Sequence, residues 1–209
     1  MSQSGCKESR FRPSIALDSH ERPALQIAAS RNRTTPLVAL GLGAALAVAI
    51  YVFGRNHSPD YTTSLFGSSG TGTYSVKAGI ATGVLVLAVL QITSAAWIFG
   101  KLPRLPPASR PVKLGHRLVG ALAILATIPV AYHCIFAYGV QTMSARVAVH
   151  SIAGCLLYGT ILVKIAGVRL RRMPALTLPL AGGALVTLVV VLWYTSALWK
   201  FNNYSLPVL

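Results

Sequence analysis

Five long stretches without a Lys, Arg, Asp or Glu side chain alternate with short charged segments along this chain of 209 residues. The stretches are residues 34–54, 78–100, 118–145, 147–163 and 173–199. About 20 apolar residues span a bilayer as an α-helix, and unpaired backbone groups cannot face lipid. The pattern therefore predicts an all-α, polytopic membrane protein, a bundle of five transmembrane helices at about 36–54, 78–100, 115–139, 146–167 and 174–199.

Composition supports a lipid-embedded chain, because 54% of the residues are hydrophobic and only 11% are charged, whereas soluble domains carry about a quarter charged residues. The net charge of +15 is unevenly placed. Lys and Arg gather in segments 1–33, 101–117 and 164–172, while the alternate connections hold only Arg55, Lys77, Arg146 and Lys200. The excess of basic residues in cytoplasmic loops predicts an N-terminus inside and a C-terminus outside, in a multi-pass protein of the plasma membrane. We expect the basic residues to set the orientation and to contact anionic headgroups of the lipid bilayer, and we expect no nucleic-acid partner.

The segments outside the spans are expected to be irregular. The sequence predicts a disordered basic cytoplasmic tail at residues 1–33, which are rich in Ser, Arg and Pro. It predicts a short outer tail at residues 202–209. The membrane domain is then 34–201. The connection at 55–74 is rich in Ser, Gly and Thr and is expected to be a flexible loop.

Two histidines lie inside apolar stretches, His133 in the third expected helix and His150 in the fourth. At 1.5 Å per residue, each lies roughly 6 to 9 Å below the outer end of its helix. A short connection makes these helices antiparallel neighbours, and a titratable side chain in hydrocarbon normally faces a partner, a cofactor or water. Two facing imidazoles at one depth predict bis-histidine ligation of a b-type haem, with His133 and His150 as iron ligands.

Three further residues are candidates for binding a cofactor. Gly154 lies one turn beyond His150 and leaves space beside its helix, and Arg146 lies one turn toward the outer surface, where a guanidinium can hold a haem propionate. His116 lies about 25 Å from His133 along the helix, at the expected inner interface. It has no second histidine at its depth, so it is either an interfacial contact, part of a quinone site, or a ligand completed by another subunit.

Other interpretations of the histidine pair remain open. No Asp or Glu follows Asp60, so any chemistry of the spans relies on imidazole, thiol, hydroxyl and amide groups. Copper is an alternative because Cys134 and Cys155 lie near the histidines, although helix geometry rotates them by about 100° and 140° from these rings. Hydrogen bonding between helices is a third interpretation.

Short motifs in this chain resemble a known family. They are Gly-His-Arg at 115–117, Tyr-His-Cys at 132–134, Arg146 with Val-His-Ser at 149–151, Gly-Cys at 154–155, Lys164, and Thr-Ser-Ala-Leu-Trp at 195–199. Over about residues 35–201 the chain resembles an actinobacterial family of uncharacterised small integral membrane proteins. The resemblance implies a redox setting, since that family is often encoded beside Rieske iron-sulfur proteins and its helical core is similar to cytochrome b and ferric-reductase-like haem proteins. Those proteins use two ligand pairs, whereas this chain offers one pair and the lone His116.

These observations lead to one principal expectation and two alternatives. The principal expectation is a membrane-embedded b-type haem electron-transfer protein, a cytochrome-b-like oxidoreductase component that exchanges electrons near the outer face with a redox protein, such as a Rieske-type partner, or with quinone. One alternative is a non-catalytic membrane anchor or subunit of a redox complex, in which the histidines are structural. A transporter is the second alternative, disfavoured because the spans lack carboxylates and a clear repeat.

Overall fold

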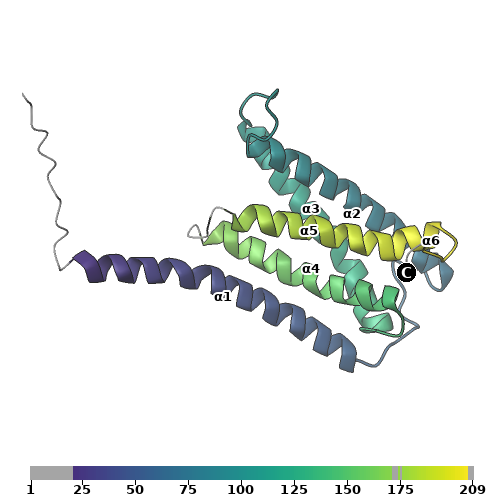
Figure 1. Ribbon diagram of the computed structural model, residues 1–209. Helices are drawn as coiled ribbons and strands as arrows, with labels where there is room; N and C mark the ends of the chain where they lie inside the picture. Colours follow the sequence, from purple (N-terminus) through teal and green to yellow (C-terminus); the bar gives the residue numbers. More distant parts are fainter. Residues whose placement is uncertain (1–20, 171–173, 175, 207–209) are drawn as a thin grey trace, which may run out of the picture.

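The computed structural model describes residues 21–170, 174 and 176–206, with side chains from residue 36, and these residues form helices joined by loops (Figure 1). The elements are α1 (Glu21–Asn56), α2 (Thr71–Ile98), α3 (Arg110–His133), α4 (Ala145–Arg169), α5 (Thr177–Trp193) and the short α6 (Trp199–Phe201). Two π-helical turns, η1 (Cys134–Tyr138) and η2 (Tyr194–Leu198), extend α3 and α5.

Within the described residues, five helical segments are long and apolar enough to cross a membrane. They are Pro36–Asn56, Thr71–Ile98, Arg110–Tyr138, Ala145–Arg169 and Thr177–Phe201. The prediction of an all-helical, multi-pass membrane protein with five spans is therefore confirmed.

Helix boundaries differ from the prediction in two places that affect the argument. First, α2 begins at Thr71, directly after Gly70 with its positive φ of 56°, well before the expected start at residue 78. Lys77 is consequently part of the helix. Second, α1 begins at Glu21, so residues 21–33 of the expected disordered tail are helical, while residues 1–20 lie outside the described part of the chain.

The helices lie side by side in the order α1, α4, α5, α2, α3, each packed against the next (Figure 1). The consecutive helices α3 and α4 are not among the pairs that pack closely. They were expected to be antiparallel neighbours, and they meet through the Tyr158 and Thr127 side chains without close backbone packing. The connection between them folds onto α1 instead, because the Val140 N–H donates to the Gly54 carbonyl over 2.8 Å and α4 packs along α1.

Small residues explain the close packing of α1 against α4. A Cβ atom added at Gly159 would lie 2.5 Å from the Gly43 carbonyl oxygen, and one added at Gly43 would lie 2.7 Å from the Gly159 carbonyl oxygen. Ala39 and Ala47 lie one turn on either side of Gly43 and are also buried. This spacing of small residues is typical of membrane helices whose backbones approach closely.

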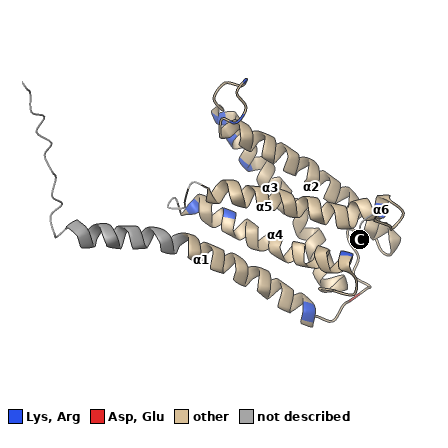
Figure 2. Cartoon of the chain, in the orientation of Figure 1, with Lys and Arg blue, Asp and Glu red and all other residues tan. Residues whose placement is uncertain are grey.

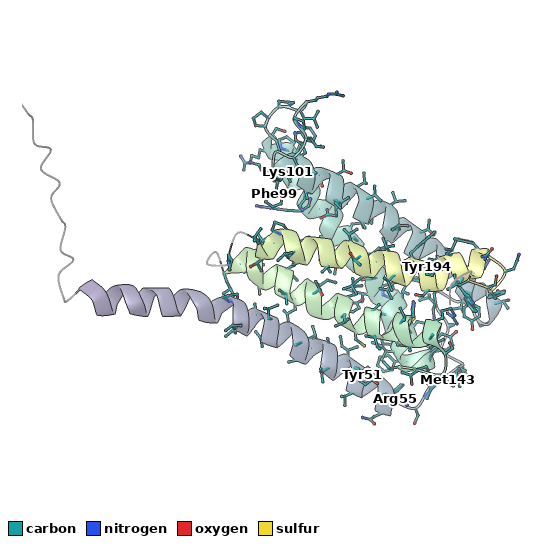
Figure 3. The ribbon with its side chains drawn as sticks, viewed as in Figure 1. Tyr51, Arg55, Phe99, Lys101, Met143 and Tyr194 are labelled. Carbon is teal, nitrogen blue, oxygen red and sulfur yellow. The ribbon has the colours of Figure 1, made fainter. Side chains whose placement is uncertain are left out.

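The two ends of the bundle differ in charge. The blue ribbon segments in Figure 2, which mark Lys and Arg, gather where α2 ends, α3 begins and α4 ends. We call this the basic end, defined by Lys101, Arg104, Arg110, Lys113, Arg117, Lys164 and Arg169. The opposite end, called the histidine end, holds the ends of α1 and η1, the starts of α2 and α4, and α6. In Figure 3, Phe99 and Lys101 lie at the basic end, whereas Arg55 and Met143 lie at the histidine end.

Candidate functional site

His133 is the last residue of α3, and of the α3 residues it alone is buried, with 2% of its surface exposed. Its Nε2 lies 3.0 Å from the carbonyl oxygen of Thr63, in the loop between α1 and α2. Because a carbonyl only accepts hydrogen bonds, Nε2 carries the proton and donates. The lone pair is therefore on Nδ1, which is buried and has no hydrogen-bond partner among the described residues.

His150 lies in the second turn of α4, and its Nδ1 is 2.9 Å from the hydroxyl oxygen of Thr195 in η2. That hydroxyl donates its own proton to the Val191 carbonyl over 2.7 Å, so it accepts from the imidazole. The proton is thus on Nδ1 and the lone pair on Nε2, for which the described part of the chain provides no hydrogen-bond donor.

Both histidines consequently have one ring N–H held by an oxygen and the other nitrogen without a partner. Metal-ligating histidines are usually held in this way, because the outer hydrogen bond fixes the tautomer and the ring orientation. The structure places both at the same end of the bundle but brings neither ring into contact with the other, within the residues described. By helix geometry His133 is rotated about 120° from Thr127, a position of α3 that contacts α4.

His133 and His150 lie on α3 and α4, two helices that are not among the closely packed pairs. His150, Gly154 and Tyr158 follow one another at four-residue spacing on one face of α4. The Tyr158 hydroxyl donates to the Thr127 hydroxyl of α3 over 3.1 Å, which connects the two helices two turns below His150. A Cβ atom added at Gly154 would meet no atom within 4 Å. Gly154 is half-buried, and the space beside it is open.

Arg146 lies one turn from His150 on α4 and is held in place by η2 and α6. One guanidinium N–H donates to the Thr195 carbonyl over 3.0 Å, and the guanidinium lies over the Trp199 ring, 3.8 Å from its centroid. Arg146 and His150 thus both attach α4 to the same turn of the last helix. The remaining guanidinium N–H groups are oriented by these contacts.

Two residues of the site were not identified from the sequence. The sequence pattern places Lys77 in a connection between helices, because an uncharged run begins at Ala78. In the structure Lys77 is buried within α2, with 9% of its surface exposed. Its Nζ lies 4.3 Å from the centroid of the Tyr138 ring in η1. Thr195 enters the sequence analysis only as part of the Thr-Ser-Ala-Leu-Trp motif at 195–199. No Pro occurs between Tyr61 and Lys101. This feature of the sequence is compatible with a predicted helix that begins before Lys77.

His116 is at the basic end and does not join the other two histidines. Its Nδ1 lies 2.8 Å from the Ser94 hydroxyl of α2, and its backbone carbonyl accepts from the Gln91 amide. The described residues contain no group of three or more His, Cys, Asp or Glu side chains that could hold a metal ion. A copper site built from His133, His150, Cys134 and Cys155 is therefore not formed.

Asp60 orders the loop between α1 and α2, whose Thr63 carbonyl accepts the hydrogen bond from His133. The Thr62 side chain donates to the Asp60 carboxylate over 2.6 Å and the Thr62 backbone N–H over 3.0 Å, and the Thr63 hydroxyl adds a third hydrogen bond. These hydrogen bonds, that of the Thr62 side chain foremost, lower the pKa of the exposed Asp60 carboxyl below its usual value. The Asp60 N–H also donates to the Phe136 carbonyl over 3.0 Å, which fixes the loop above His133.

The fold and this cluster define a multi-pass membrane protein with one buried histidine, His133, and one half-buried histidine, His150, at one end of a helical bundle. The chain belongs to a family of unknown function, DUF6529, whose model matches residues 36–208. The match confirms the expected membership of an uncharacterised family, whereas an actinobacterial origin and the likeness to cytochrome b gain no support from it. Neither the curated proteins nor the solved structures contain a match to this chain.

Proposed function

We propose that the chain is a b-type haem electron-transfer protein of the plasma membrane, with its N-terminus inside and the histidine end at the outer face. The observation that carries this proposal is the state of His150. Its Nδ1–H is committed to Thr195 and its Nε2 lone pair has no partner within the described bundle. A neutral imidazole with one fixed nitrogen and one free nitrogen is the ordinary iron ligand of haem proteins.

The residues around His150 fit a flat, apolar ligand. Open space lies beside Gly154, and α3 and α4 do not pack closely. The Tyr158–Thr127 hydrogen bond would form the inner limit of a ligand placed between these two helices. His133 supplies a second imidazole, of which the buried Nδ1 is unpartnered in the described structure. In this proposal the two helices bind and orient the group, and the apolar side chains exclude water from it. A bound haem would supply the one-electron chemistry.

One hydrogen bond favours the alternative function. The hydrogen bond from His133 Nε2 to the Thr63 carbonyl attaches the loop between α1 and α2 to the end of α3. A histidine with that structural role suits a non-catalytic membrane subunit that anchors a redox partner. In the haem proposal, by contrast, the same bond holds the ring while the other nitrogen serves as the ligand. The electron partner in either case would be a redox protein, such as a Rieske-type protein, or membrane quinone.

The absorption spectrum of the purified protein tests the proposal. Protein isolated from haem-replete cells is expected to show the α, β and Soret bands of a b-type cytochrome in a reduced-minus-oxidised difference spectrum. The bands should persist after detergent exchange, because bound haem does not leave with free lipid. A folded but colourless preparation that still co-purifies with a partner would support the anchor instead.

Filling the space beside Gly154 is expected to remove haem without unfolding the bundle. A Gly154→Leu side chain would occupy the open space beside Gly154, where the proposal places the haem, so haem content should fall about tenfold or more while helix content and melting temperature change little. Gly183→Leu is the matched control, because an added Cβ at Gly183 also meets nothing within 4 Å and lies on another helix. Equal haem in the two variants would show that the group lies elsewhere.

A further inference from the structure

Lys77 is a buried cation without a carboxylate partner among the described side chains. It lies six residues into α2, and 9% of its surface is exposed. No Asp or Glu follows Asp60 in the sequence, and Asp60 is bound to Thr62 and Thr63 on the loop surface. No carboxylate of the described residues forms an ion pair with Lys77. Contact of the ammonium with the Tyr138 ring offsets only part of the cost of burying a charge away from water.

Arg146 is the second cation of the same region, and aromatic side chains connect the two. Arg146 lies over Trp199, and Trp199 meets Tyr74 edge to face with ring centroids 6.3 Å apart. Tyr74 lies one turn before Lys77 on α2, so it neighbours Lys77 on the helix surface. Arg146 lies one turn from His150 on α4, and Lys77 lies near the start of α2 at the same end of the bundle. The two cations and the imidazole therefore share the histidine end.

We propose that Lys77 and Arg146 form a carboxylate-binding site at the histidine end of the bundle. The inference rests on the proposed function, because the carboxylates are those of the haem, whose two propionate groups match two fixed cations beside a free imidazole. Ammonium and guanidinium groups bind carboxylates through charge-assisted hydrogen bonds, which are stronger than neutral ones. A free dicarboxylate in the external medium offers the same chemistry from another source.

Comparison of haem with its dimethyl ester tests the site. The full-length protein, prepared without haem in nanodiscs, is titrated with ferric haem and with haem dimethyl ester while the Soret band is followed. The wild type is expected to bind haem about 10- to 100-fold more tightly than the ester, as one or two charge-assisted hydrogen bonds imply. Lys77→Gln and Arg146→Gln should each lose most of this preference, Lys77→Arg should keep it, and Lys113→Gln, at an exposed position of the basic end, is the control.

The outcomes separate this inference from the proposed function. If the wild type binds haem and ester equally, the carboxylate site is wrong while the haem proposal stands. If neither haem nor the ester binds, the haem proposal fails. Thermal unfolding in succinate then tests whether Lys77 and Arg146 bind free carboxylates. Stabilisation of the wild type that Lys77→Gln loses would support a site for free carboxylates, and stabilisation that is absent or equal in both would overturn it.

Discussion

Replacement of His150 with alanine is expected to remove nearly all bound haem from the purified protein. The alanine lacks the Nε2 lone pair that the hydrogen bond to Thr195 fixes, and no other described side chain offers a free imidazole at this position of α4. The measurement is the haem-to-protein ratio from the pyridine haemochrome. His57→Ala is the control, because His57 also lies at the histidine end but stacks on Phe53 with ring centroids 5.6 Å apart.

His133 needs a variant that separates its two roles. Glutamine places its side-chain amide near the position of Nε2 and can still donate a hydrogen bond to the Thr63 carbonyl, but it supplies no imidazole ligand. If His133 binds iron, His133→Gln should lose the low-spin spectrum of a bis-imidazole haem even though the loop stays attached. Full haem content with an unchanged spectrum in both His150→Ala and His133→Gln would contradict the ligand assignment.

The second large effect is expected at the contact of α1 with α4. A leucine at position 159 cannot fit where a Cβ atom alone would lie 2.5 Å from the Gly43 carbonyl oxygen and 3.1 Å from the Ala47 Cβ. Gly159→Leu should destabilise the bundle by about 1–3 kcal/mol or more, the usual cost of overpacking. Thermal unfolding in detergent or nanodiscs measures the change.

Position 41 provides the control for that substitution. An added Cβ at Gly41 meets no atom within 4 Å, so Gly41→Leu changes the volume and hydrophobicity of α1 without forcing the helices apart. Its melting temperature should stay near that of the wild type. Equal destabilisation by the two leucines would show that α1 does not pack against α4 through Gly43 and Gly159.

The five spans were predictable because a bilayer imposes a length and a hydrophobicity on each helix. The pairing of helices was not predictable in the same way. Chain connectivity favoured α3 beside α4, whereas the close approach of Gly43 and Gly159 and the bond from Val140 to Gly54 direct α4 onto α1. Such contacts join residues far apart in sequence, and the hydrophobic pattern alone does not encode them.

The candidate site was predicted in part. His133, His150, Arg146 and Gly154 do share one end of the bundle, as counting residues along helices indicated. Rotation about each helix axis decides what a side chain faces, and here the π-helical turn η1 after His133 and the partners Thr63 and Thr195 determine it. Lys77 was missed because a charged residue at the edge of an apolar run normally marks the end of a membrane helix. Its burial depends on contacts with other helices, which the local sequence does not specify.

The haem-to-protein ratio of the wild-type protein, purified from haem-replete cells, tests the central claim most directly. The account predicts a ratio near one haem per chain with a reduced-minus-oxidised spectrum of the b type. A folded, monodisperse protein with no haem, which also fails to take up added haem, would contradict it.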